Sequence, residues 1–281
     1  MPADHFAGRA GVVTGAGAGI GRALAVELAR RGARLALWDR DGVALDETAA
    51  RCRAVGAVVR TDVVDVADRT AVAAATAAVE TAFGQVQLVF CLAGVIHTGS
   101  VLASAADDVE RVFAVNLHGT VHTVTALLPL VLASGGGHVV TTSSAFGLVA
   151  VPRYSAYCAS KAAVRAFTDA LRLELAGEGM PVRVSCVVPG GVRTGIVRAG
   201  GFADDEDADA VATRFETVIA RTTPEDAALA VLAGVRRGRA QILVGADARA
   251  VALLTRLTGN AYQRVLPRLV RRRRAGGTPT Q

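Results

Sequence analysis

A tyrosine and a lysine four residues apart are the side chains of this sequence that could carry out acid–base chemistry. Lys161 is the only lysine, since the other 30 of the 31 basic residues are arginine, and it lies four residues after Tyr157. On a helix these positions share a face, so the ammonium can lie beside the phenol, favour the phenolate and lower a tyrosine pKa from about 10. We therefore predict that Tyr157 is a general acid–base group; a chance pair on a solvated helix face is the alternative.

A glycine-rich turn near the N-terminus predicts a phosphate-binding site. The run Thr-Gly-Ala-Gly-Ala-Gly-Ile-Gly at 14–21 follows an expected strand at 10–14 and opens an expected helix at 20–31. Glycines there let the backbone approach a pyrophosphate, whose charge is favoured by a helix N-terminus. The turn residues expected to contact a dinucleotide are Gly15, Gly17, Gly19, Ile20 and Gly21.

An acid after the second expected strand selects between the two nicotinamide dinucleotides. Asp39 lies about 20 residues after the turn, where a carboxylate can accept hydrogen bonds from an adenosine ribose and would repel the extra phosphate of NADP. No basic residue occupies Ala16 or Ala18 within the turn, but Arg40 could meet a 2′-phosphate. The sequence favours NAD, with NADP as the alternative.

The elements that position these residues alternate between strands and helices. Strands are expected at 10–14, 34–39, 57–61, 88–92, 138–142, 182–188 and 241–244, and helices at 20–31, 43–55, 69–83, 107–132, 154–175 and 224–237. The alternation predicts a doubly wound parallel sheet, a Rossmann-like α/β fold, in one domain over 1–245. Residues 246–281 are expected to form a basic, amphipathic, helical C-terminal extension, because apolar residues recur every three or four positions with arginines between them.

Composition narrows the class of protein. Apolar residues make up 52% of 281, which suits helices packed on a buried sheet, and no apolar run approaches the roughly 20 residues of a membrane span. The N-terminus lacks a signal-peptide pattern, and four cysteines without a C-x-x-C pair predict reduced thiols in a cytoplasmic protein. Five scattered histidines give no ligand spacing, so no metal site is expected. Four consecutive arginines at 271–274 are interpreted as a solvated tail rather than a nucleic-acid site.

Together these features resemble the short-chain dehydrogenase/reductase family over about residues 8–245. Thr14, Gly15, Gly19 and Gly21 meet its glycine pattern, and Ser144 lies 13 residues before Tyr157, the usual interval. Asn116 matches the catalytic asparagine of the family. The Asn-Asn-Ala-Gly segment of the family appears here as Cys-Leu-Ala-Gly at 91–94, so Leu92 replaces an amide that usually ties that strand together.

The resemblance implies an oxidoreductase that transfers a hydride between a nicotinamide and a carbonyl or carbinol carbon. Tyr157 would transfer the proton, Ser144 would bind the same substrate oxygen, Lys161 would hold the nicotinamide ribose and Asn116 would anchor a water. The catalytic residues implied are Asn116, Ser144, Tyr157 and Lys161, and the last two and Asn116 would also contact the cofactor. The further cofactor contacts implied are Asp62, Val63, Ala93, Gly94, Pro189, Gly190, Val192 and Thr194.

Mostly apolar residues flank this predicted site and favour a hydrophobic secondary alcohol or ketone as the substrate. The substrate residues expected are Ser144, Phe146, Val151, Tyr154, Tyr157 and Gly191. A substrate lid is expected over about 195–220, and its acidic run at 204–209 is interpreted as a solvated loop leading into a helix.

Other functions and partners remain open at this point. A dehydratase or epimerase that uses bound NAD would share the turn and the Tyr/Lys pair, and a non-enzymatic cofactor-sensing module would keep the glycines and Asp39. The resemblance implies a homodimer or homotetramer through the helices at 107–132 and 154–175. The extension at 246–281 could lie on an anionic membrane, but packing over the substrate cleft or a partner subunit is favoured.

Overall fold

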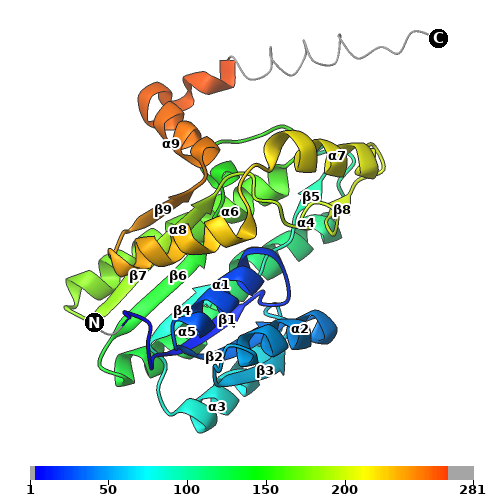
Figure 1. The fold of residues 1–281 in the computed structure, drawn as a ribbon. Helices are drawn as coiled ribbons and strands as arrows, with labels where there is room; N and C mark the ends of the chain where they lie inside the picture. The colour runs from blue at the N-terminus through cyan, green and yellow to red at the C-terminus, as the bar shows by residue number, and fades with distance from the viewer. Residues whose placement is uncertain (1–3, 265–281) are drawn as a thin grey trace.

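The computed structural model describes residues 4–264 and has a parallel sheet covered on both faces by helices (Figure 1). The seven strands follow the order β3-β2-β1-β4-β6-β7-β9. Their bounds are β1 Ala10–Thr14, β2 Arg34–Asp39, β3 Val59–Val63, β4 Leu88–Cys91, β6 Gly137–Thr142, β7 Val182–Pro189 and β9 Gln241–Val244. The direction of winding reverses between β1 and β4, which is where open α/β sheets bind ligands. The predicted doubly wound fold is confirmed.

Alternate strand residues face opposite helix layers because successive side chains of a strand point to opposite faces of the sheet. Val13 packs with α1, α2 and α8, whereas Val12 and Trp38 pack with α3, α5 and α6. Both layers are visible in Figure 1. The helices are α1 Gly19–Arg30, α2 Gly42–Arg53, α3 Arg69–Phe83, α4 Ala106–Phe113, α5 Gly119–Ala133, α6 Ser155–Gly177, α7 Ala208–Arg214, α8 Pro224–Arg236 and α9 Ala246–Thr258.

Strand β3 begins two residues later than the sequence indicates. Gly56 has a φ of 85°, and the amide of Ala57 donates to the carbonyl oxygen of Cys52, so both residues belong to the turn that follows α2. Glycine commonly ends helices in this left-handed conformation. The strand therefore starts at Val59 and runs on to Val63.

The helix expected at 107–132 consists of α4 and α5, joined by a π-helical turn at Ala114–His118 that carries Asn116. Single π turns inside helices often occur at functional sites. The whole segment, Ala106–Ala133, is long and apolar enough to cross a membrane. Here α5 packs against α3 and against strands β4 and β6, so it forms part of the layer that covers the sheet.

The expected lid contains structure that periodicity could not predict because each element is very short. Strand β8 (Gly201–Phe202) pairs in parallel with β5 (His97–Thr98), and α7 is followed by a π turn at Phe215–Ile219. The extension begins with α9, which packs against β9 and the 3-10 turn Ala145–Gly147. Residues 265–281, with the arginines at 271–274, lie outside the described residues.

Candidate active site

A cavity of about 560 Å³ lies at the carboxyl ends of the central strands. It brings together the glycine turn, the ends of β4, β6 and β7, the first turns of α6 and the lid. The predicted site residues that line it are Gly15, Gly19, Ile20, Gly21, Asp39, Arg40, Ala93, Gly94, Ser144, Phe146, Tyr157, Lys161, Pro189, Gly190, Gly191, Val192 and Thr194. Segments far apart in the sequence therefore converge on one space.

The glycine turn packs too closely on its neighbours to accept side chains. Gly15 has a φ of 67°, and a Cβ there would lie 2.7 Å from the amide nitrogen of Ala93. A Cβ at Gly21 would collide with the carbonyl oxygen of Gly15, and one at Gly19 would lie 2.8 Å from Cγ2 of Thr194. The cradle beside the N-terminus of α1 stays open for this reason and fits the pyrophosphate of a dinucleotide.

Asp39 lines the cavity beside the glycine turn and is held there by two backbone amides. The amide of Gly17 donates to its Oδ2 at 2.8 Å, and the amide of Asp41 donates to Oδ1 at 3.1 Å. A Cβ at Gly17 would lie 2.9 Å from the same carboxylate. Gly17 therefore does not line the cavity but makes room for Asp39 and orients it.

Two further expected cofactor contacts, Asp62 and Val63, do not line the cavity. Asp62 is inside β3 and accepts a hydrogen bond from Nε of Arg60 at 2.9 Å, and Val63 is exposed. Asp65 and Val66 line the cavity in their place, because β3 ends later than the sequence suggests. Neither Asp62 nor Val63 lines the cavity, although the adjacent Val64 does, and a contact of these two residues with the cofactor stays a prediction. The segment holds two Asp-Val pairs, and only the end of the strand distinguishes them.

Tyr157 and Lys161 are both buried in the first turns of α6. The Lys161 Nζ atom lies 5.8 Å from the centroid of the Tyr157 ring and donates to the carbonyl oxygen of Thr142 at 3.0 Å. The Tyr157 phenol is hydrogen-bonded to the hydroxyl of Ser144. Tyrosine, serine and lysine thus share one wall of the cavity.

Burial dominates the ionisation of this pair. It raises the pKa of Tyr157 to about 12, against the opposing effect of the Ser144 hydrogen bond, and it lowers the pKa of Lys161 to about 8. Both charged forms lose hydration in the interior. The expectation that Lys161 lowers the pKa of Tyr157 is not met, because the ammonium is directed at Thr142. Near pH 7 the phenol is protonated and the lysine is mostly charged.

Asn116 does not line the cavity; it bonds to the loop and the helix that do. It is fully buried; its Oδ1 accepts from the amide of Val95 at 2.8 Å, and its Nδ2 donates to the Val95 carbonyl oxygen and to Ser160 Oγ, both at 3.0 Å. A Cβ at Gly94 would lie 3.1 Å from Asn116 Oδ1 and 3.2 Å from Lys161 Nζ. Asn116 therefore ties the loop after β4 to the helix that carries the lysine.

Although Leu92 has no side-chain amide, the end of β4 is still held by hydrogen bonds. The hydroxyl of Thr14 accepts hydrogen bonds from the amides of Leu92 at 3.1 Å and of Ala93 at 3.2 Å. A residue of the first strand thus holds the position where the family usually has a side-chain amide.

The wall beyond Tyr157 is apolar. A cluster of buried and half-buried side chains joins Tyr157 to the lid, and it contains Ile96, Phe146, Tyr154, Ile196, Val197, Phe202, Val211, Ala212 and Phe215. Of the expected substrate residues, Val151 and Tyr154 do not line the cavity. Tyr154 packs against Phe146, with ring centroids 5.2 Å apart. Val151 directs its amide at Cys158 Sγ, 3.5 Å away.

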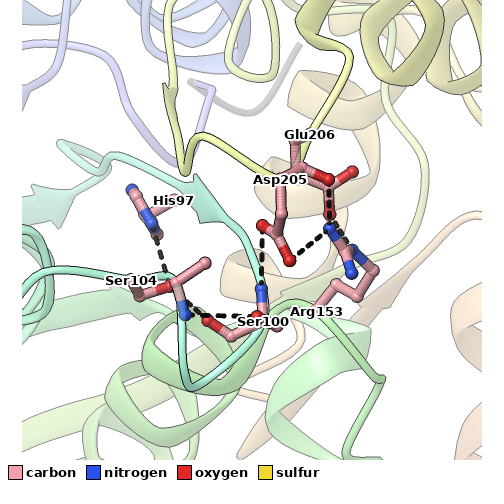
Figure 2. A network of polar contacts seen from close by, with 7 residues as sticks. His97, Ser100, Ser104, Arg153, Asp205 and Glu206 are labelled. Atoms are coloured by element: carbon pink, nitrogen blue, oxygen red, sulfur yellow. Dashed lines mark hydrogen bonds and ion pairs between the residues drawn. The ribbon is translucent and has the colours of Figure 1, made fainter.

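The lid is attached to the body by a network of polar contacts (Figure 2). Arg153 pairs with Asp205 at 3.0 Å and with Glu206. The amide of Ser100 lies 3.5 Å from Asp205 Oδ1, and Ser104 Oγ bridges the Ser100 carbonyl oxygen (2.9 Å) and His97 Nε2 (3.1 Å). Two acids of the run expected to be solvated are therefore anchors of the lid.

The cavity also has contributors that sequence reasoning missed. Ile96 follows β4, and Asp247 and Val251 come from α9. No spacing or motif connects the α9 residues with the catalytic pair, since they are about 90 positions away in the chain and only the fold brings them to the cavity.

Comparison with known proteins agrees with this geometry. The sequence profile of the family described as short chain dehydrogenase matches residues 9–201. A Mycobacterium tuberculosis protein named "Putative oxidoreductase SadH" is 46% identical over 263 residues, 94% of this chain and 95% of its own. Estradiol 17-beta-dehydrogenase 11 of Rattus norvegicus is 40% identical over 193 residues, 68% of this chain and 65% of its own.

A solved structure has the same architecture over nearly the whole chain. It is a short chain dehydrogenase/reductase from Burkholderia phymatum in complex with NAD, with a TM-score of 0.80, 31% identity and coverage of 98% of each chain. The chain therefore belongs to the short-chain dehydrogenase/reductase family and is an NAD(P)-dependent oxidoreductase.

Proposed function

We propose that this enzyme transfers a hydride between NAD and a hydrophobic secondary alcohol or its ketone. The observation that carries the proposal is the apolar wall around Tyr157, formed by Ile96, Phe146, Val197 and Phe215. Apolar pockets with few convergent polar groups bind apolar ligands and use the polar groups to orient them. Here the polar groups are the hydroxyls of Ser144 and Tyr157. The name of estradiol 17-beta-dehydrogenase 11, which refers to a steroid alcohol, supports the same substrate class.

Asp39 supports NAD rather than NADP. Its carboxylate already receives two amide hydrogen bonds, so it is fixed as an acceptor for ribose hydroxyls at the adenosine end. A 2′-phosphate there would meet this negative charge at close range. Arg40 also lines the cavity and is the group through which NADP could still bind.

The chain's own residues supply the proton and the orientation. When bound, NAD supplies the site that accepts or donates the hydride. During reduction the protonated Tyr157 donates its proton to the carbonyl oxygen and becomes a phenolate; during oxidation the phenolate form of Tyr157 takes the proton from the alcohol. Ser144 bonds to the same oxygen and stabilises the charge that develops on it. Lys161, whose Nζ atom lies 5.8 Å from the centroid of the Tyr157 ring, would hold the nicotinamide ribose beside the phenol.

A substrate and cofactor screen tests this proposal. Secondary alcohols of increasing apolar size, with sugar alcohols as polar controls, are incubated with NAD or NADP, and the absorbance of the reduced cofactor is followed. We expect kcat/KM to rise with apolar size and to be higher with NAD. Substrate conversion without net NADH would instead favour the dehydratase or epimerase chemistry and contradict the proposal.

The cofactor preference has its own test in Asp39→Ser. Removing the carboxylate while Arg40 remains should lower the kcat/KM ratio of NAD to NADP by about 10- to 100-fold, because one or two charge-assisted hydrogen bonds of about 1.5–3 kcal/mol are involved. Glu47→Ser on the neighbouring helix is the matched control. An unchanged ratio in Asp39→Ser would show that another group selects the cofactor.

We also propose that the enzyme is a cytoplasmic homodimer or homotetramer that pairs through α4–α5 and α6. The exposed Leu173 on α6 and the four buried free cysteines are consistent with such an assembly in a reducing compartment. Light scattering of the purified protein measures its oligomeric state directly. A monomer at micromolar concentration would contradict the assembly.

A further inference from the structure

Helix α9 reaches the active-site cavity from beyond the segment that the family profile matches. That match ends at residue 201, and α9 spans Ala246–Thr258. Asp247 and Val251, four residues apart on one face of α9, both line the cavity. The start of the C-terminal extension is thus part of the cavity wall.

Asp247 bonds to the loop that follows β7. Its Oδ2 accepts a hydrogen bond from the amide of Gly191 at 2.6 Å. The Gly191 carbonyl oxygen accepts from the amides of Arg221 at 3.1 Å and Thr222 at 3.2 Å, at the end of the lid. The backbone of Gly191 is therefore held by α9 on one side and by the lid on the other.

Two glycines leave the space that this carboxylate occupies. A Cβ at Gly190 would collide with both carboxylate oxygens of Asp247. Gly245 has a φ of 94°, and a Cβ there would lie 2.5 Å from Asp247 Oδ1. Within residues 4–264, the Gly191 amide is the hydrogen-bond partner recorded for the Asp247 carboxylate.

We propose that Asp247 is a positioning residue that fixes the 189–192 loop against the nicotinamide side of the cofactor site. The inference rests on the proposed use of this loop by NAD. A hydrogen bond to a carboxylate is shorter and about twice as strong as one between neutral groups, so it can hold a glycine-rich loop in one conformation. Without it, the loop would be free to move at the place where the reacting carbon must be held.

The first test compares two substitutions by NADH binding, measured by fluorescence without any alcohol. Asp247→Ala should weaken NADH binding about 10- to 100-fold, the equivalent of the roughly 1.5–3 kcal/mol of a hydrogen bond to a charged group. Asp247→Asn keeps an oxygen that can accept from Gly191 and should stay within about fivefold of the unchanged protein. Arg249→Ala, on the same turn of α9, is the control. Wild-type NADH binding by Asp247→Ala, or an equal loss in Asp247→Asn, would overturn the proposal.

The second test uses the unliganded protein and so does not depend on activity. Gly190→Ala should lower the free energy of unfolding in the unchanged protein, because the new methyl group meets Asp247. The same substitution should be much less harmful in the Asp247→Ala background, which gives a non-additive double-mutant cycle. Equal losses in both backgrounds would mean that the carboxylate does not occupy this place. If no alcohol is turned over, the proposed function fails. The NADH-binding comparison and the double-mutant cycle of unfolding can still be carried out and still test the role of Asp247.

Discussion

Two ionisable side chains of this enzyme are buried, and burial destabilises the charged form of each. Tyr157 and Lys161 are 8% and 3% exposed, and burial moves their pKa values in opposite directions, up to about 12 and down to about 8. Apolar residues at these two positions would give the folded protein a higher free energy of unfolding. The pair therefore reflects what the reaction needs rather than what folding favours. The same shifts make the stability of the protein depend on pH.

Replacing the lysine should reveal this dependence. The Lys161 pKa is lowered from 10.5 to about 8, so between these pH values the unfolded chain binds a proton that the folded chain does not, and wild-type stability rises with pH. At pH 7 the buried ammonium costs on the order of 3 kcal/mol. Lys161→Met should therefore be more stable than wild type at pH 7, and the difference should narrow between pH 8 and 10.5. Urea unfolding at several pH values measures it; a constant difference would contradict a buried, shifted lysine.

Removing the Tyr157 hydroxyl should separate chemistry from binding. Tyr157→Phe keeps the ring that packs with Phe146 but has no proton to transfer, so kcat should fall by at least about 100-fold. NADH affinity and the melting temperature should change little. Tyr262→Phe, which alters a phenol that accepts from the Ala150 amide outside the cavity, is the control. A substantial kcat in purified Tyr157→Phe would rule out the assigned proton donor.

At the scale of elements, the lid is held by side chains from three segments. Arg153, which precedes α6, is the only non-glycine residue within 4–264 with a positive φ, at 75°. Its carbonyl oxygen accepts from the Gly99 amide at 2.8 Å while its guanidinium reaches the lid acids (Figure 2). A left-handed backbone is unfavourable for arginine, and the contacts on both sides of the residue maintain it.

Arg153→Ala should loosen the lid without touching the reacting groups. The variant loses the pairs with Asp205 and Glu206, so the KM for the alcohol should rise about three- to tenfold while kcat changes less, since a partly exposed pair contributes roughly 1 kcal/mol. Arg198→Ala, which removes an ion pair to Glu216 inside the lid, is the control. Steady-state kinetics measure KM for both variants. A wild-type KM in Arg153→Ala would contradict the anchoring role.

At the scale of the whole molecule, one cavity joins segments from residue 15 to residue 251. Ligand that occupies it binds the folded chain alone, so binding must stabilise the entire fold. NAD at about 100 times its Kd should raise the free energy of unfolding by about 2.7 kcal/mol, and NADP at the same concentration should raise it less. Thermal unfolding with each dinucleotide measures the effect. Equal stabilisation by both would argue against selection by Asp39.

Local patterns were enough to predict most of this protein. The strand and helix alternation depends on side-chain periodicity, and the Tyr157–Lys161 pair on the pitch of one helix, so neighbouring residues contain that information. The glycine turn and Asp39 follow from the backbone conformation and charge that a dinucleotide requires. The confirmed sheet and the cavity that these residues share agree with those predictions.

Contacts between distant segments had to be read from the tertiary structure. Asp65 lines the cavity and Asp62 does not, because β3 runs on to Val63, and Tyr154 packs against Phe146 instead of lining the cavity. Asp205 and Glu206 belong to a run that the sequence indicates as solvated, yet they contact Arg153, and Asp247 contacts the Gly191 amide; each partner is more than 50 residues away. Such contacts depend on how the layers pack, and no periodicity within one segment encodes them.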